Sequence, residues 1–278
     1  MSSQSISSSE LRASLADAEK IYRRLGWVLK VRPQPLAVVL GNVVGGVNRR
    51  RLVELPNGIA YYLDPLTQFA SRWFELGAYE RETEAIFRAE IRPDDVVVDV
   101  GANEGYFTIL AAQLAHRGRV IAVEPQARCI EAITRNLDAN AIKNCTIQPV
   151  ALGQMQGAGE LLLMPEMNSG ASSLVRSYRW SRRKQPVEII DANELAARIG
   201  VQDIDFVKVD VEGYEPEVVR GLLPLLRAGR VKKLLLDYHP TILAPRGIKP
   251  EDIHAQIVAS GMQGVLNKDG YTLYRAAK

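Results

Sequence analysis

From Pro93 onward, short apolar runs alternate with segments of helical periodicity, and this alternation constrains the fold more than any other feature. The apolar runs are VVVDV (96–100), RVIAVEP (119–125), CTIQPVAL (145–152), IDFVKVD (204–210) and KKLLLDYH (232–239). They are continuous rather than alternating, as expected for parallel strands that are buried on both faces. Helices are predicted between them at about 105–116, 128–140, 216–228 and 250–260. Strands and helices in this order predict a mostly parallel, doubly wound α/β sheet.

The last strand-like segment differs in its turn chemistry. GVLNKDGYTLYRA (264–276) contains Lys268-Asp269-Gly270, a turn sequence that predicts an antiparallel hairpin at the C-terminus. Residues 91–278 are therefore expected to form one ligand-binding domain.

Residues 1–90 are expected to form an N-terminal extension that serves as a lid or a dimerisation region. Ser7 and Glu10 have the spacing of a capping box, and an amphipathic helix should run from there to the prolines at 33 and 35. RRRLVELPNGIAYYLDP (49–65) predicts a hairpin around Pro56-Asn57-Gly58. A further helix is expected from about Gln68, with a break near Gly77. The apolar face of the first helix makes a homodimer a candidate assembly.

Charge is distributed unevenly along the chain. The 278 residues carry a formal net charge of only +3, which does not indicate a nucleic-acid partner. Residues 1–53 contain nine Lys/Arg and three Asp/Glu, so this segment alone is +6. Two interpretations stay open for it: a contact with an acidic membrane surface or anionic partner, or a solvated helix face.

Targeting signals are not recognised in the sequence. The N-terminus lacks the basic and apolar regions of a signal peptide, and the apolar run at 35–47 is too short and too rich in glycine to span a bilayer. Cys129 and Cys145 have neither the spacing of metal ligands nor that of a disulfide framework. A cytoplasmic protein without a transmembrane segment is expected.

Four of the predicted strands end in acidic residues, namely Asp99, Glu124, Asp210 and Asp237. A single such residue is often only a helix cap. Ligands of doubly wound sheets bind beyond the carboxyl ends of the strands, so four carboxylates at that edge predict a functional site. They would repel one another unless a cation balances them.

The segment VVVDVGANEGYF (96–107) places a turn with two glycines after the first of these strands. Gly101 and Gly105 allow the backbone to turn tightly and to approach a ligand, and the next helix directs its N–H groups towards it. The G-x-G-x-x-G spacing of dinucleotide-binding loops is missing. Asp99 and Glu104 flank the turn and would repel a pyrophosphate, but they suit the ammonium and sulfonium groups of S-adenosylmethionine (SAM).

Glu124 ends the next strand, a position at which a carboxylate accepts hydrogen bonds from both hydroxyls of a ribose. This residue fits NAD and SAM equally. The charges around the glycine turn therefore decide the prediction in favour of SAM.

The chain resembles the FkbM family of SAM-dependent methyltransferases between about Gly77 and His239. The similarity lies in DVGANEGYF, VEP, VALG, SSL (172–174) and, most specifically, IDFVKVDVEGYE (204–215). It implies a class I, Rossmann-like methyltransferase fold and O-methylation of a sugar or secondary-metabolite hydroxyl. By position it implies a SAM site formed by Asp99, Gly101, Asn103, Gly105, Tyr106, Glu124 and Ala151. Tyr79 and Glu80 match a family YE pair expected at the methionine end of SAM, whereas Asp237 stands where members often have Glu.

The second acidic pair is expected to carry the chemistry. Methyl transfer to an alcohol requires alignment of the acceptor oxygen and removal of a proton of very high pKa. Asp210 is predicted to act as base or metal ligand, assisted by Asp237 and His239. Asp210 and Asp237 are candidate ligands of Mg²⁺ or another divalent cation, which would lower the pKa of the hydroxyl. The alternative is structural: residues 210–213 form a rigid turn and Asp237 anchors a loop.

Residues 176–184, RSYRWSRRK, interleave cations with Tyr178 and Trp180. They could hold an acidic glycan or a phosphorylated acceptor, or form a solvated connector. The sequence thus predicts a SAM-dependent O-methyltransferase for a small-molecule or glycan acceptor. The alternatives are an RNA or protein methyltransferase of the same fold and a SAM-binding protein without activity.

Overall fold

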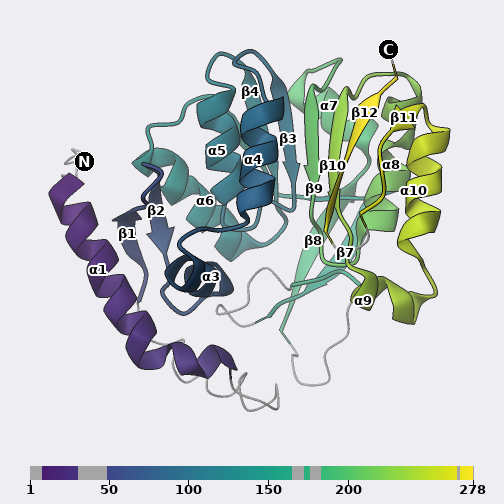
Figure 1. Cartoon of the computed structure of the whole chain (residues 1–278). Helices are drawn as coiled ribbons and strands as arrows, with labels where there is room; N and C mark the ends of the chain where they lie inside the picture. The colour runs from purple at the N-terminus through teal and green to yellow at the C-terminus, as the bar shows by residue number, and fades with distance from the viewer. Residues whose placement is uncertain (1–7, 31–48, 165–171, 176–182, 268–269, 278) are drawn as a thin grey trace.

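The computed structural model describes residues 8–30, 49–164, 172–175, 183–267 and 270–277. Its centre is a seven-stranded sheet with the strand order β11-β12-β10-β9-β3-β4-β5 (Figure 1). The five adjacent strands from β10 to the edge strand β5 are parallel, and β12 lies antiparallel to both of its neighbours. The strands are β3 Val96–Val100, β4 Arg119–Val123, β5 Cys145–Gln148, β9 Phe206–Val209, β10 Lys233–Asp237, β11 Met262–Gln263 and β12 Tyr271–Ala276. This order confirms the predicted class I methyltransferase fold.

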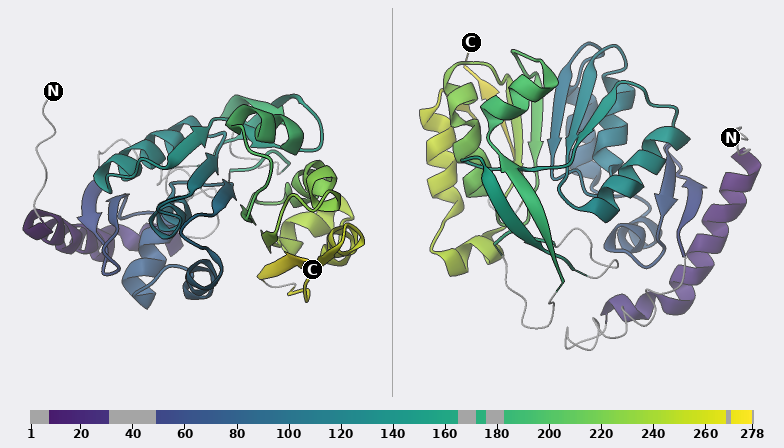
Figure 2. Two further views of the ribbon diagram at one scale, coloured as in Figure 1. Left: turned by 90° about the horizontal axis from the view of Figure 1, so that it is seen from above. Right: turned by 180° about the vertical axis from the view of Figure 1, so that it is seen from behind.

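Helices cover both faces of the sheet (Figure 2). Along β3, Val97 faces an apolar cluster that includes α5 (Tyr106–Leu114) and α4 (Arg81–Glu90), whereas Val98 faces α7 (Ala192–Ile199), α8 (Glu215–Arg227) and α10 (Pro250–Ala259). Helix α6 (Ala127–Ala139) packs on the α5 side through Ile133 against Ala122. Because successive strand residues point to opposite faces, a strand buried on both sides must be apolar throughout, as the sequence is.

The N-terminal segment forms the elements predicted for it. These are α1 (Ser8–Leu25), the 3₁₀ helix η1 (Gly26–Lys30), a hairpin of β1 (Arg51–Glu54) with β2 (Ala60–Leu63), and α3 (Gln68–Leu76). Helix α3 ends at Gly77, whose φ of 70° is left-handed, and the chain restarts in α4. The capping-box residue Ser7 and the two prolines at 33 and 35 lie outside the described residues.

Packing joins this segment to the sheet. A single apolar cluster contains Tyr61 and Phe87 together with Val97 and Phe206, and the rings of Phe87 and Phe206 are 5.2 Å apart. The boundary at residue 90 and the roles as lid or dimer contact remain predictions.

Helix α7 and three further features of the fold were not predicted from the sequence. CTIQPVAL is two strands, β5 and β6 (Ala151–Leu152), separated at Pro149, which has no amide hydrogen for a sheet ladder. Strand β6 forms a second sheet with β8 (Lys184–Ile190) and β7 (Gly157–Leu162), in the order β6-β8-β7. The third is the short helix α9 (Pro240–Leu243) with its 3₁₀ extension η3 (Ala244–Arg246). The C-terminal antiparallel pair is present as β11 and β12, but β11 lies at 262–263, ahead of the predicted segment 264–276, and residues 268–269 of the predicted turn lie outside the described ranges.

Candidate active site

One cavity opens at the carboxyl edge of the central sheet, where the sequence predicted a site. Its walls come from the ends of β3, β4, β9 and β10, from α3, from the loop before α4, and from β6 and residues 172–174. The predicted site residues among its lining are Tyr79, Glu80, Gly101, Asn103, Gly105, Tyr106, Glu124, Ala151, Asp210, Asp237 and His239. Eleven of the twelve predicted residues thus lie around the same space, and only Asp99 does not.

Gly101 brings the cofactor turn into contact with the second motif. Its φ is +78°, and a Cβ placed on it would lie 1.9 Å from the backbone oxygen of Asp210. Only glycine fits here, since any side chain would both clash and strain the backbone. Asn103 also has a positive φ, 50°, as does Gly105, the N-cap of α5. Positive φ at a residue other than glycine is uncommon and is found preferentially at functional sites.

Glu124 is held by the same turn. Its two carboxylate oxygens accept hydrogen bonds from the backbone amides of Asn103 and Gln126, both at 2.8 Å. Burial raises the pKa of Glu124 to about 7, because the amide hydrogen bonds offset only part of the desolvation. The carboxylate is fixed in orientation and still has lone pairs for a ligand in the cavity.

Asp99 differs from its predicted role. Its side chain is fully buried and accepts hydrogen bonds from Thr108 Oγ1 at 2.7 Å and Lys208 Nζ at 3.3 Å. The register explains this, because Asp99 pairs with Lys208 across β3 and β9 and neighbouring residues of parallel strands share a face. Asp99 therefore binds Lys208 in the interior of the protein and does not line the cavity.

The charges beside the glycine turn also differ from the prediction. Glu104 is bound to Arg50 at 2.6 Å, and both side chains are largely buried. Asp99 and Glu104, the two carboxylates that flank the turn, thus each have a cationic partner. Their charges are therefore largely compensated within the protein, although Glu104, unlike Asp99, lies in the wall of the cavity.

Tyr79 and Glu80 close one side of the cavity. Tyr79 packs between Phe69 and Tyr106, with ring centroids 4.6 and 5.5 Å away. Glu80 adopts a φ of 43° and pairs with Arg72 at 3.2 Å. Its Oε2 is buried and has no hydrogen-bond partner within the described part of the chain. Burial, followed by the charge of Asp210, raises the pKa of Glu80.

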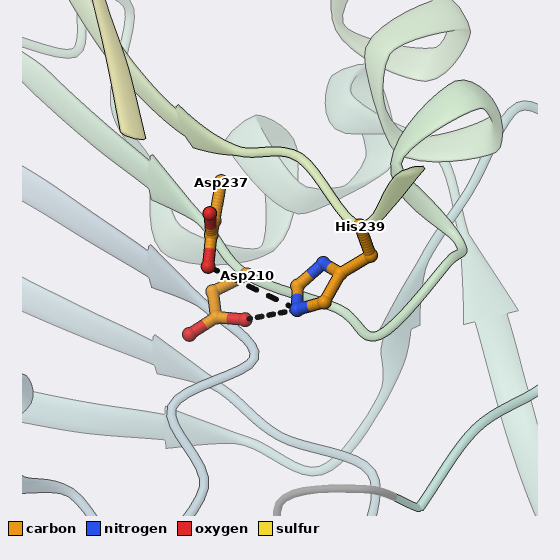
Figure 3. A group of neighbouring side chains, drawn as sticks. All are labelled: Asp210, Asp237 and His239. Carbon is orange, nitrogen blue, oxygen red and sulfur yellow. Dashed lines mark ion pairs between the residues drawn. The ribbon is translucent and has the colours of Figure 1, made fainter. Parts of the chain in front are cut away.

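Asp210, Asp237 and His239 point towards one another at the other side of the cavity (Figure 3). His239 Nε2 lies 3.8 Å from Asp210 Oδ1 and 3.8 Å from Asp237 Oδ2. One potential ligand atom from each of the three residues falls within 4.8 Å of the others. The side chains are between a fifth and a quarter exposed, so the group is open to a ligand in the cavity.

Burial and charge set different protonation preferences in this group. Burial and then the charge of Asp210 raise the pKa of Asp237 to about 7. Burial opposes ionisation of Asp210 most strongly, but the charges of Lys208 and His239 and the hydrogen bond from Tyr271 together outweigh it and lower the pKa of Asp210. For His239, burial lowers the pKa, whereas a 2.7 Å hydrogen bond to Glu215 and the charge of Asp210 raise it more, to about 10. Two carboxylates with separated pKa values and one imidazole are typical of acid–base sites.

A family model described as "Methyltransferase FkbM domain" matches residues 99–253, more than half of the chain. The chain belongs to the FkbM methyltransferase family. This is the family that the motifs in the sequence predicted.

Curated relatives resemble this methyltransferase at modest identity. The hexuronic acid methyltransferase AglP of Haloferax volcanii is 26% identical over 174 residues, which cover 63% of this chain and 66% of AglP. The 2-O-methyltransferase NoeI of Sinorhizobium fredii is 24% identical over 145 residues, covering 47% of this chain and 58% of NoeI. The chain thus spans less than two thirds of the length of either relative. A crystal structure of a methyltransferase FkbM from Methylobacillus flagellatus is 13% identical with a TM-score of 0.46, covering 95% of this chain and 59% of that one.

Sequence reasoning missed three residues that hold Asp210 and His239 in place. Lys208 is buried 3.5 Å from Asp210, Tyr271 donates to Asp210 Oδ2 at 3.0 Å, and Glu215 binds His239. Lys208 had a visible signal, since it is the only charge within the buried strand β9. Glu215 belongs to the quoted motif, but nothing in the sequence connects Tyr271 to a residue sixty positions earlier.

The other predictions for this methyltransferase have mixed outcomes. The arginines at 176, 179 and 182 and the aromatics at 178 and 180 lie outside the described residues. Lys184 is described and forms an exposed ion pair with Glu160. Across the described ranges, no helix has both the length and the apolar character needed to cross a membrane.

Proposed function

We propose that the protein transfers the methyl group of SAM to a hydroxyl of a sugar, a glycan or a secondary metabolite. The observation that carries this proposal is the presence of Asp210, Asp237 and His239 in the same cavity as the glycine turn and Glu124. A donor held by the turn and an acceptor held by the three side chains would meet there. The names of the relatives, a hexuronic acid methyltransferase and a 2-O-methyltransferase, support a carbohydrate acceptor.

The lining of the cavity fits SAM at two points. Glu124, fixed by two backbone amides, would accept hydrogen bonds from the ribose hydroxyls. Glu80 offers a buried carboxylate oxygen that has no hydrogen-bond partner among the described residues, a suitable acceptor for the ammonium of the methionine moiety. When bound, SAM supplies an electrophilic methyl group, and the protein has to place an oxygen in line with it.

The acidic group would position the acceptor and receive its proton. Asp210 is held by Lys208 and Tyr271 and stays ionised, so it would orient the hydroxyl through a charge-assisted hydrogen bond. Asp237 has a pKa of about 7 and is better matched to accept a proton near neutral pH. His239, fixed by Glu215, lies between the two carboxylates and would stabilise the negative charge that develops on the oxygen.

A divalent cation is a second way to balance these charges. Ligand atoms about 2.0–2.2 Å from an ion lie roughly 3.0–3.5 Å from one another. The separations of 3.8 Å around His239 Nε2 are slightly wider than this, and small side-chain rotations would close the difference. The hydrogen bond between Glu215 and His239 Nδ1 also fits a metal site, because metal-binding histidines are usually oriented by a carboxylate on the other ring nitrogen. Asp210, Asp237 and His239 would hold the ion, which would lower the pKa of the acceptor hydroxyl.

An acceptor screen with methyl-labelled SAM tests the proposal. The protein is incubated with neutral glycosides, uronic acids, polyols, RNA and a protein extract, and label is followed into each fraction. Label in a sugar or polyol, in alkali-stable ether linkage, is the expected result. Label found only in RNA or protein would show that these are the acceptors. Label in an alkali-labile ester on a uronic acid would show that the methylated group is a carboxylate and not a hydroxyl.

The same assay decides on the cation. Protein treated with EDTA is assayed before and after addition of Mg²⁺ or Mn²⁺. Loss of turnover that returns with the ion supports the metal site, and Mn²⁺ should restore more than Mg²⁺ because an imidazole is among the ligands. Full turnover in EDTA would reject the metal site, and His239 would then be the cation that lies between the two carboxylates.

A further inference from the structure

The outward face of helix α1 carries cations that end in an exposed tryptophan. This α1 outer face consists of the exposed side chains of Arg12, Lys20, Arg23 and Arg24 in α1 and of Trp27 in η1, and the exposed Asp17 lies among them. Trp27 is 57% exposed, the largest aromatic side chain among the exposed residues of the described chain. Ala18 and Tyr22, on the opposite side of the helix, are buried against the body. Helix α1 lies at the rim of the molecule in Figures 1 and 2, so its outer face is turned away from the sheet.

The neighbouring acidic groups reduce the positive charge of this face only in part. Lys20 pairs with Asp17, Arg23 with Glu19 and Arg12 with Glu54, all through cations that are more than 70% exposed. Exposed pairs of this kind contribute little and exchange partners readily. Phosphate groups at a surface could therefore replace these carboxylates as partners of the arginines.

The end of this face lies close to the wall of the cavity. Tyr22 binds Ser71 and Glu75 of α3, and Lys30 binds the same Glu75 at 2.8 Å. On another side of α3, Arg72 lines the cavity. Helix α3 thus lies between the α1 outer face and the candidate active site.

We propose that the α1 outer face docks on an anionic lipid bilayer. Cations beside an anionic leaflet are attracted to it, and exposed tryptophans favour the headgroup region of a bilayer, so Arg24 and Trp27 both suit such a surface. Pairing with a second copy is less favourable, because the same face on both subunits would oppose cations to cations. Resting on the proposed function, this docking places the cavity beside the bilayer and indicates an acceptor hydroxyl on a lipid-anchored molecule.

Vesicle sedimentation with the full chain tests the proposal. The probes are vesicles of phosphatidylcholine alone and vesicles of phosphatidylcholine and phosphatidylglycerol in a three-to-one ratio. Binding to the anionic vesicles only, weakened by added salt, is expected. Arg24→Ala should weaken this binding about 5-fold, since one cation near an anionic surface is worth roughly 1 kcal/mol. Trp27→Ala should weaken it further and reduce its persistence at high salt.

Two controls test other exposed positions. Arg227→Ala removes an exposed cation at the end of α8, and Val265→Ala trims a side chain that is 89% exposed before β12. Both should bind vesicles as the parent does, and all four variants should keep the parent melting temperature and SAM affinity. Equal binding to both kinds of vesicle, no binding, or equal losses for all four variants would overturn the proposal. A dimer lost on Trp27→Ala without vesicle binding would assign the face to a second copy, and binding of RNA alone would assign it to nucleic acid.

These outcomes are independent of the proposed reaction. Vesicle binding without transfer to any hydroxyl would retain the docking surface and reject the O-methyltransferase proposal. Transfer to a soluble glycoside without vesicle binding would do the reverse.

Discussion

The two sides of the cavity are built from different kinds of group. On the side proposed to bind the cofactor, backbone atoms do most of the positioning: Gly101 turns the chain, and two main-chain amides fix Glu124. On the acceptor side, side chains position one another, as Lys208 does for Asp210 and Glu215 for His239. Figure 3 shows the acceptor side as a group of side chains that point inward from two strand ends.

This difference predicts how each side responds to substitution. Backbone positions are set by the fold and depend little on pH or on single side chains, so the cofactor side should change mainly when its steric fit changes. Side-chain charges in a partly buried group depend on one another, so the acceptor side should respond to every change of charge. Changes on the first side should appear in SAM binding and changes on the second in turnover.

The largest effect is expected for Asp210→Asn. It retains the shape of the side chain but removes the charge that orients the acceptor, so kcat should fall by about 10²–10⁴ while the dissociation constant for SAM changes little. Isothermal titration and turnover assays measure the two quantities separately. Asp203→Asn, an exposed change of the same type ahead of β9, is the matched control and should be silent. A variant at Asp210 with normal turnover would remove the proposed role.

Gly101→Ala should have the opposite effect and impair SAM binding rather than turnover. Its Cβ would meet the Asp210 carbonyl, so the turn must shift, and we expect SAM affinity to fall by about 10², with roughly 1–3 kcal/mol of lost stability. Gly200→Ala is the control, because Gly200 also has a positive φ, 64°, but a methyl group there would meet no other part of the described chain within 4 Å. It should lose stability without losing SAM binding. Equal SAM affinities for the two variants would show that the turn is more adaptable than the contact indicates.

Glu215→Gln should have a smaller effect, confined to turnover. Glu215 is fully buried and joins His239 Nδ1 to the amide of Gly213. Replacing a carboxylate that orients a histidine typically costs 10–100-fold, and we expect a loss of about that size in kcat or in cation affinity. Glu217→Gln, in the same helix and bound to Arg246, is the control. If SAM affinity fell by the same factor, the two sides of the cavity would not be separable.

The smallest effect concerns the pH dependence of SAM binding. The pKa of Glu124 is raised to about 7, so its carboxylate is lost as pH falls through neutrality, and SAM affinity should decrease about tenfold between roughly pH 8 and pH 6. Glu124→Gln should bind SAM weakly at both pH values and abolish this dependence. A titration series over this range, with both proteins, measures it.

The stability of the ligand-free protein should change in the opposite direction. A carboxyl group whose pKa is raised on folding binds more protons in the folded state between its unfolded pKa of 4.5 and about 7. Its contribution to stability is therefore fully present below pH 4.5 and is lost as pH rises through 7. Glu124→Gln should then melt at a higher temperature than the parent above neutral pH. A parent protein whose SAM affinity is the same at both pH values would indicate that Glu124 does not bind the ribose.

Much of the fold could be predicted because strands that are buried on both faces must be apolar along their whole length. The five parallel strands are continuous apolar runs, and each was placed to within a few residues. The sheet of β6, β7 and β8 could not be recognised from apolar runs, because half of β7 is exposed and it contains two glycines, and β8 contains Pro186. Tertiary pairing rather than local preference forms these strands.

The site was predictable in its membership but not in its pairings. The sequence placed Glu124, Asp210, Asp237 and His239 at one edge, since strand ends of a parallel sheet meet there. It could not show that Asp99 faces Lys208, because this depends on the register between two strands more than a hundred residues apart. The same applies to Arg50 and Glu104, whose ion pair depends on how the N-terminal hairpin packs.

The contact between Gly101 and the Asp210 carbonyl has a consequence for how such proteins can diversify. The glycine turn and the segment that follows β9 are in direct steric contact. A change in the length or sequence of one segment therefore requires a matching change in the other. New acceptors must therefore be acquired through segments outside this pair, such as α3 or the sheet of β6, β7 and β8, which border the cavity without taking part in that contact. In recombined or designed versions of the enzyme, residues 99–105 and 210–213 should be treated as one inherited unit.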